Sequence, residues 1–201
     1  DAAQPGRRGG TSATAPAARG HKSPLDIGSV GDFAGSGGTR LSDTRAAELL
    51  ARRLYPRDQF LARKGMFEEL IVAFNRQVAK QYGIPANHLA SGMAMALAGG
   101  WTAYTGRPFP DAAVRPLVAQ LDRALQADAA IGTMPVRDKV MFYHLMVGSG
   151  MWLLALQIDL GQQPDRAHAA RLNQLGADYL QSLVGVPPER LRFGAQGLQI
   201  Q

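Results

Sequence analysis

The chain has 201 residues, a length that suits one domain with a single hydrophobic core. Apolar residues make up 46% of it and charged residues 19%, which is typical of a soluble globular protein and excludes a collagen-like or wholly disordered chain. The net charge of +6 favours anionic partners, without the charge density of a dedicated nucleic-acid binder. Because the chain has no cysteine, it has no disulfide, thiolate metal site or cysteine nucleophile.

Residues 1–41 differ in composition from the rest, because Gly, Ala, Ser, Thr and Pro dominate them. Such a segment buries too little apolar surface to offset its ordering entropy, so we expect an extended arm or linker. Its spaced apolar residues suggest a peptide that docks in a partner's groove, and an irregular linker is the alternative. The expected docking residues are Leu25, Ile27, Val30 and Phe33.

The chain begins with Asp1 instead of Met, which indicates removal of a preceding segment by a signal peptidase or an engineered start. The first residues, Asp-Ala-Ala-Gln-Pro, are typical of a mature exported protein, and a chain without cysteine suits either side of the membrane. We therefore expect a periplasmic or extracellular protein whose signal peptide has been removed.

From Leu41 onward, apolar residues recur every three or four positions, which predicts amphipathic helices. Caps, prolines and glycines divide residues 42–187 into a bundle of five to six helices. The expected helices are 43–54, 57–82, 87–104 with Asn87 as its cap, one to about 126 that begins near Asp111 or more safely at Pro116, one opened by Thr133 and Pro135 and ended by Gly161, and one from Pro164 to Gly185. Alternation in residues 188–201 predicts a β-like tail or hairpin, whose Leu198 and Ile200 are further candidates for partner binding.

Two Gly- and Ala-rich segments are expected to lie at the centre of the bundle. Residues 89–104 carry no charge, and residues 140–158 are apolar nearly all round. The second segment reaches the length of a bilayer span, but His144 and the flanking charges favour a buried helix over a transmembrane one. We expect residues 148–150 to pack against the small face of the first segment. That face consists of Gly92, Ala96 and Gly100.

No motif indicates catalysis, a cofactor or a metal site. The four histidines lie in different segments, without the spacing of a zinc-binding helix. We expect His144 to be a core histidine bonded to a backbone carbonyl, and an enzyme built around it is only a third hypothesis. Ser149 lies within a predicted helix instead of at a strand-to-helix turn, so packing explains it better than nucleophilic catalysis.

One basic cluster lies at the junction of the first two expected helices, with Tyr55 and Phe60 interleaved. It could contact phosphates or an anionic polysaccharide. A solvated helix surface is the alternative, because nearby acidic residues partly neutralise the charge. The basic cluster consists of Arg52, Arg53, Arg57, Arg63 and Lys64.

Three stretches are similar to a known family. They are Phe74-Asn-Arg-Gln-Val-Ala-Lys-Gln-Tyr-Gly83, the small-residue helix from Leu89-Ala into Trp101-Thr-Ala-Tyr-Thr-Gly106, and Val114-Arg115 with the later helices to Leu191-Arg-Phe193. On these stretches, residues 67–193 resemble a bacterial family of unknown function made of short exported all-α proteins. The resemblance implies an Ala- and Gly-rich arm ahead of a helical domain, and no catalytic residue.

Together these observations predict an exported, non-catalytic assembly or accessory protein. It would attach to itself or to a larger envelope complex through its N-terminal arm and C-terminal tail. The alternative is a binding module for an anionic polymer or nucleic acid through the basic cluster, with nucleic acid the less favoured partner. We expect a protein partner or a homo-oligomer, no small-molecule cofactor, no metal and no transmembrane helix.

Overall fold

The structure, a computed structural model, describes residues 23–28 and 41–201. These residues form a helical bundle that ends in a two-stranded antiparallel hairpin. The elements are α1 Arg45–Leu54, α2 Phe60–Ala73, α3 Ala79–Tyr82, α4 Leu89–Thr105, α5 Asp111–Ala127, α6 Ala129–Thr133, α7 Val136–Gln162, α8 Arg166–Val184, β1 Leu191–Gly194 and β2 Gly197–Ile200. The predicted all-α bundle with a short β-like tail is confirmed.

The helix starts follow the sequence signals, with two corrections. The cap of α4 is His88 instead of Asn87: the His88 side chain accepts a backbone N–H of the first turn, whereas Asn87 has a φ of 52° and turns the chain before the cap. α5 begins at Asp111, and Pro116 lies inside it instead of at its start. The buried face of α5 already includes Ala113, so packing extends this helix to the N-terminal side of the proline.

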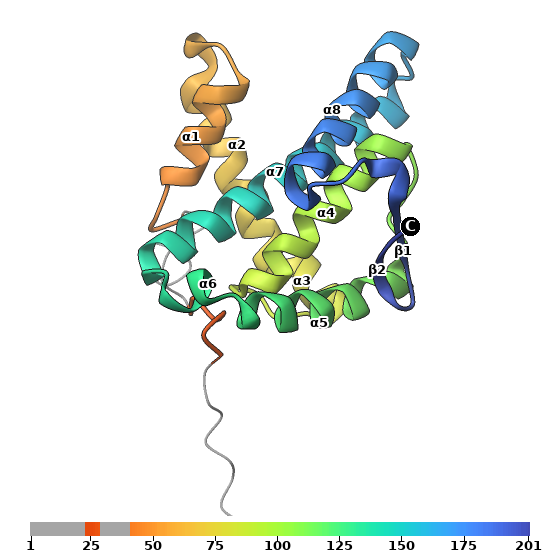
Figure 1. Ribbon diagram of the computed structural model, residues 1–201. Coiled ribbons are helices and arrows are strands. Elements are labelled where there is room, and N and C mark those ends of the chain that lie inside the picture. Colours follow the sequence, from red (N-terminus) through yellow and green to blue (C-terminus); the bar gives the residue numbers. More distant parts are fainter. Residues whose placement is uncertain (1–22, 29–40) are drawn as a thin grey trace, which may run out of the picture.

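α4 and α7 cross at the centre of the molecule, as expected (Figure 1). Their backbones touch, because a Cβ placed on Gly150 would lie 2.9 Å from the Cα of Ala96, and one on Gly99 would overlap the Gly150 carbonyl. α8 approaches α4 from another side, where a Cβ on Gly176 would lie 2.7 Å from the carbonyl oxygen of Gly100. The small residues of α4 therefore admit two neighbouring helices instead of the single one predicted.

α7 is the one helix in the described part of the chain that is long and apolar enough to cross a membrane. In the fold, 44% of its most apolar window is buried, and it packs against α1, α2, α4 and α8. Tyr143, Val147 and Leu153 are almost fully enclosed by these neighbours. Core helices of soluble proteins have the same length and composition, and α7 takes that central position here.

The short described segment at 23–28 is attached to its own chain. Ile27 donates its backbone N–H to the carbonyl of Asn87 over 3.0 Å, and Leu89 donates its N–H to the carbonyl of Leu25 over 3.1 Å. Both apolar side chains are buried, with Leu25 0% and Ile27 2% exposed. The segment thus completes the core beside the start of α4.

Shortening Ile27 to valine is expected to destabilise the protein by about 1 kcal/mol, because it removes a buried methyl group. Chemical unfolding of the full chain would measure the change. The matched control is Ile200→Val, since Ile200 is 51% exposed and should tolerate the same change without loss. Equal stability of the two variants would contradict the burial of Ile27 in its own core.

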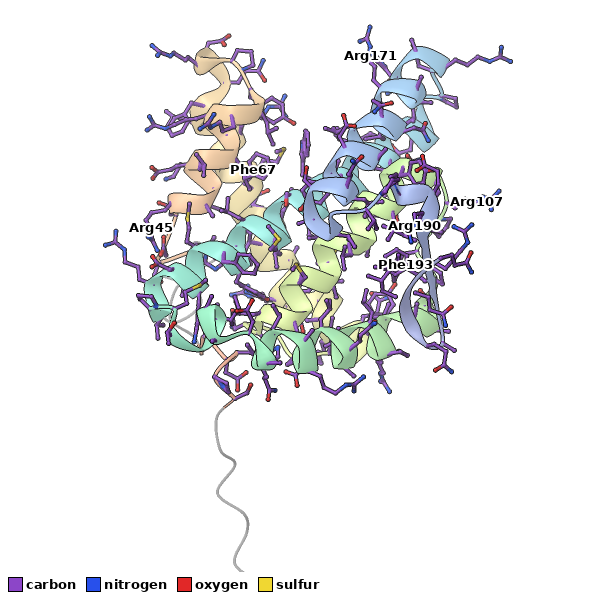
Figure 2. All side chains as sticks on the ribbon, viewed as in Figure 1. Arg45, Phe67, Arg107, Arg171, Arg190 and Phe193 are labelled. Carbon is purple, nitrogen blue, oxygen red and sulfur yellow. The ribbon has the colours of Figure 1, made fainter. Side chains whose placement is uncertain are left out.

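The C-terminal hairpin packs against α5. The Gln120 side chain donates to the carbonyl of Leu198 over 2.9 Å and accepts from its N–H over 2.7 Å. Phe193 of β1, labelled in Figure 2, packs edge-on against Phe109 with ring centroids 5.1 Å apart. Leu198 is consequently half-buried, whereas Ile200 near the end of β2 remains 51% exposed.

Candidate functional site

The basic cluster forms the end of a helical hairpin. α1 ends at Leu54, because Tyr55 adopts an extended backbone and the following Pro56 cannot continue a helix. The 3-10 turn Arg57–Gln59 then reverses the chain, and α2 packs back along α1. Figure 1 shows this turn at the projecting end of the α1–α2 pair, away from α5. We call residues 52–63 the hairpin tip.

Two arginines of the hairpin tip stack on aromatic rings. The Cζ of Arg52 lies 4.8 Å from the ring centroid of Phe60, and that of Arg63 lies 4.2 Å from the ring centroid of Tyr55. Tyr55 is itself held by α7, because the indole N–H of Trp152 donates to its hydroxyl over 2.8 Å. A stacked guanidinium keeps N–H groups at its edge for an incoming anion, so the rings orient these two arginines for binding.

Most of the hairpin tip is exposed to solvent, and few carboxylates of the described residues form ion pairs with its cations. In the described part of the chain, none of the four arginines of the basic cluster forms an ion pair with a carboxylate. Lys64 differs, since its ammonium lies 3.2 Å from Glu68 and 4.0 Å from Glu48. Arg52, Arg53 and Arg57 are exposed, whereas Arg63 is half-buried and donates from its Nε to the Gln59 side chain over 3.0 Å. Three of the five predicted cations are therefore available to a partner. A pocket of about 530 Å³ is lined by Arg52, Tyr55, Pro56, Arg57 and Phe60, so two of these arginines contribute to it.

The two described residues among those predicted for partner docking in the N-terminal arm do not lie on the surface. Leu25 and Ile27 are buried in the core of their own chain, so they are not free to fill a partner's groove. This differs from the expected docking peptide, because the backbone groups of Asn87 and Leu89 already bind the segment. Val30 and Phe33 lie outside the described residues.

Ser149 is held in structural hydrogen bonds. Its hydroxyl donates to the carbonyl of Leu145 over 2.6 Å and lies 2.5 Å from the hydroxyl of Tyr179. Burial raises the pKa of Tyr179 to about 12, so this phenol stays protonated, and either hydroxyl of the pair can be the donor. The pair links α7 to α8, and no imidazole contacts Ser149 to activate it among the described residues.

His144 is fully buried in α7. The core position is as expected, although neither ring nitrogen has a partner of ideal geometry among the described residues. Burial lowers the pKa of His144 to about 4, and the nearby Asp43 opposes the change through its carboxylate charge and through its backbone, which lies near enough to the imidazole for hydrogen bonding. The imidazole is therefore neutral at neutral pH. Within residues 23–28 and 41–201, no three His, Asp or Glu side chains gather as metal ligands would.

The profile of a protein family matches residues 33–201, which include every helix and both strands. The family is described as a family of unknown function, DUF6683. The chain belongs to this family. The resemblance seen over residues 67–193 thus extends to the hairpin tip and to the C-terminal hairpin. Searches of curated proteins and of solved structures gave no match. Membership in DUF6683 brings no known activity, so the function has to be argued from the site.

Proposed function

We propose that the protein is a non-catalytic accessory protein that binds an anionic polymer through the hairpin tip. The observation that carries the proposal is the aromatic-lined pocket of about 530 Å³, to which Arg52 and Arg57 contribute, in a hairpin tip that also carries Arg53 and Arg63. None of these four arginines pairs with a carboxylate of the described residues. Closely spaced phosphate, sulfate or carboxylate groups would receive charge-assisted hydrogen bonds from these guanidinium groups. Each contact would also release counterions from the polymer.

A purely structural role accounts for only part of the basic cluster. Arg52 and Arg53 lie in the last turn of α1, where cations stabilise the helix dipole by up to about 1 kcal/mol each at a surface. Arg57 follows that helix and Arg63 lies in the next one, so the dipole of α1 does not explain them. Arg63 donates to the Gln59 side chain and stacks on Tyr55, so contacts within the hairpin tip account for it. An anionic partner accounts for the exposed Arg57, which has neither explanation.

The hairpin tip is better supported than the attachment through chain ends that the sequence predicts. Of the six residues expected to dock a partner, two are buried in their own chain and one is half-buried on α5. The arginines, by contrast, lie at the projecting end of the molecule. An exported location, also part of this proposal, would bring the hairpin tip to the anionic polymers of a cell envelope.

Replacing Arg52 and Arg53 together with alanine is expected to weaken binding to long-chain inorganic polyphosphate. The affinity of the unaltered protein should fall steeply with NaCl, and the double variant should lose about one unit of the log–log salt slope for each arginine removed. Calorimetric titration at several NaCl concentrations gives both quantities. Because both side chains are exposed, the variant should stay folded and lose at most the contribution of the two cations to the helix dipole and of the Arg52 stacking.

The control for net charge is the pair Arg107→Ala and Arg171→Ala. Figure 2 shows Arg107 and Arg171 away from the α1–α2 pair, and both are exposed. This control removes the same charge and should retain the binding of the unaltered protein at a given salt concentration. Equal weakening in both double variants, or binding without salt dependence, would contradict the proposal.

A further inference from the structure

A second site lies at a pocket lined by the long helix between Phe60 and Tyr82, by α4 and by the start of α5. In its middle, Phe74–Val78 forms a π-helical turn, whose wider hydrogen-bonding pattern is often found at functional sites. A pocket of about 190 Å³ opens beside this turn. Its walls are largely apolar, and the residues that shape it include Phe74, Val78, Ala94, Ala98, Val114 and Leu154.

The pocket exists because the side chains on its α4 wall are small. α4 presents Ala94 and Ala98 to the π-helical turn, whereas at its crossing with α7 its small residues let the two backbones touch. The π-helical turn contributes the larger side chains Phe74 and Val78 to the same pocket. The small residues belong to α4 and the large ones to the π-helical turn. Because the two backbones do not approach closely, the small side chains leave a pocket beside α4.

Polar groups lie among the lining residues. The Tyr82 hydroxyl donates to the Asp111 carboxylate over 3.2 Å. Burial and the Asp111 charge raise the pKa of Tyr82, so the phenol remains protonated. Thr102 also lines the pocket and is 5% exposed, and its hydroxyl forms no hydrogen bond within the described part of the chain. An apolar pocket with a few convergent polar groups is the usual form of a small-molecule site.

We propose that this pocket binds a small apolar molecule that carries one hydroxyl group, such as a phenol or a short-chain alcohol. A cavity of about 150 Å³ with apolar walls is known to take up benzene, so this pocket suits a single ring or a short alkyl chain. The hydroxyl would donate to Asp111 or accept from Tyr82 or Thr102. The Asp111 carboxylate disfavours an anionic ligand such as a carboxylic acid. The hairpin tip plays no part in this site.

The test is a titration of the full chain with p-cresol, followed through the methyl NMR signals of Met95 and Leu154. The expected result is a saturable shift of both signals, with weaker binding of toluene and no binding of benzoate. Ala98→Leu should fill the pocket and weaken p-cresol binding about tenfold or more. The matched control is Ala170→Leu, because Ala170 is exposed on α8 and should leave binding unchanged.

If Ala98→Leu prevents folding, Val114→Phe narrows the same pocket from α5 and should weaken p-cresol binding in the same way. Asp111→Asn should reduce the preference for p-cresol over toluene without abolishing binding of either. Absence of saturable shifts, or equal p-cresol binding by the pocket variant and the Ala170→Leu control, would overturn the site. Equal affinity for toluene and p-cresol would overturn the assigned ligand class.

Discussion

Gly150→Ala is expected to destabilise the protein by about 3 kcal/mol or more, because the added methyl group has no room at the α4–α7 crossing. It would overlap the carbonyl oxygen of Met95 and lie 2.9 Å from the Cα of Ala96. These are backbone atoms, so no side-chain rotation can relieve the overlap, and the two central helices must separate. The higher helix propensity of alanine offsets only about 1 kcal/mol of this loss of stability.

Gly161→Ala in the same helix is the matched control. A Cβ on Gly161 meets no atom within 4 Å, so this change should leave stability unchanged or raise it by up to about 1 kcal/mol. Urea unfolding of the two variants and the unaltered chain measures the difference. Similar stability of the two variants would show that α4 and α7 do not touch through their backbones.

Much of the fold follows from periodic apolar spacing and from glycines and prolines at helix ends. The sequence could not assign each small residue to a neighbour, since periodicity defines a face of a helix and not what packs on it. Gly150 faces α4 as expected, but a Cβ on Gly148 would lie 2.7 Å from Leu50 of α1. Gly100 faces Leu180 of α8 instead of α7. The local sequence pattern therefore predicts which helices are central better than it predicts which helices pack against them.

The candidate site was visible in the sequence because the basic cluster is local. The contacts that hold the cluster's aromatic rings in place were not visible. Trp152, which donates a hydrogen bond to the Tyr55 hydroxyl, lies 97 residues away in the sequence. The pairing of Lys64 with Glu48 also joins different helices, and only the fold shows it. Long-range contacts likewise explain the buried Ile27, because its backbone partner Asn87 lies far along the chain. A sequence pattern shows which charged residues lie close together along the chain, but not which distant residues neutralise them in the fold.

His144 should make the protein acid-sensitive. Burial lowers the pKa of its imidazole from 6.5 to about 4, so the unfolded chain takes up a proton at this residue before the folded chain does. Stability supplied by the neutral His144 is complete above about pH 6.5 and is lost as the pH falls toward 4, by roughly 3 kcal/mol in total. The hydrogen bond from Arg45 lowers the pKa of Asp43 from 3.8, so Asp43 titrates below this window. Arg45 stays charged throughout.

His144→Leu is expected to flatten this part of the pH profile. The substitution keeps the side chain of similar size and removes two buried nitrogens that lack a hydrogen-bond partner of ideal geometry among the described residues, so the variant should match or exceed the original stability at neutral pH. The difference in unfolding free energy between His144→Leu and the unaltered protein should grow as the pH falls. Urea unfolding monitored by tryptophan fluorescence at several pH values between neutral and about pH 4.5 measures both curves. His168→Ala is the control, because it removes an exposed histidine from α8. Parallel curves for the unaltered protein and His144→Leu would show that His144 does not titrate with a lowered pKa in the folded state.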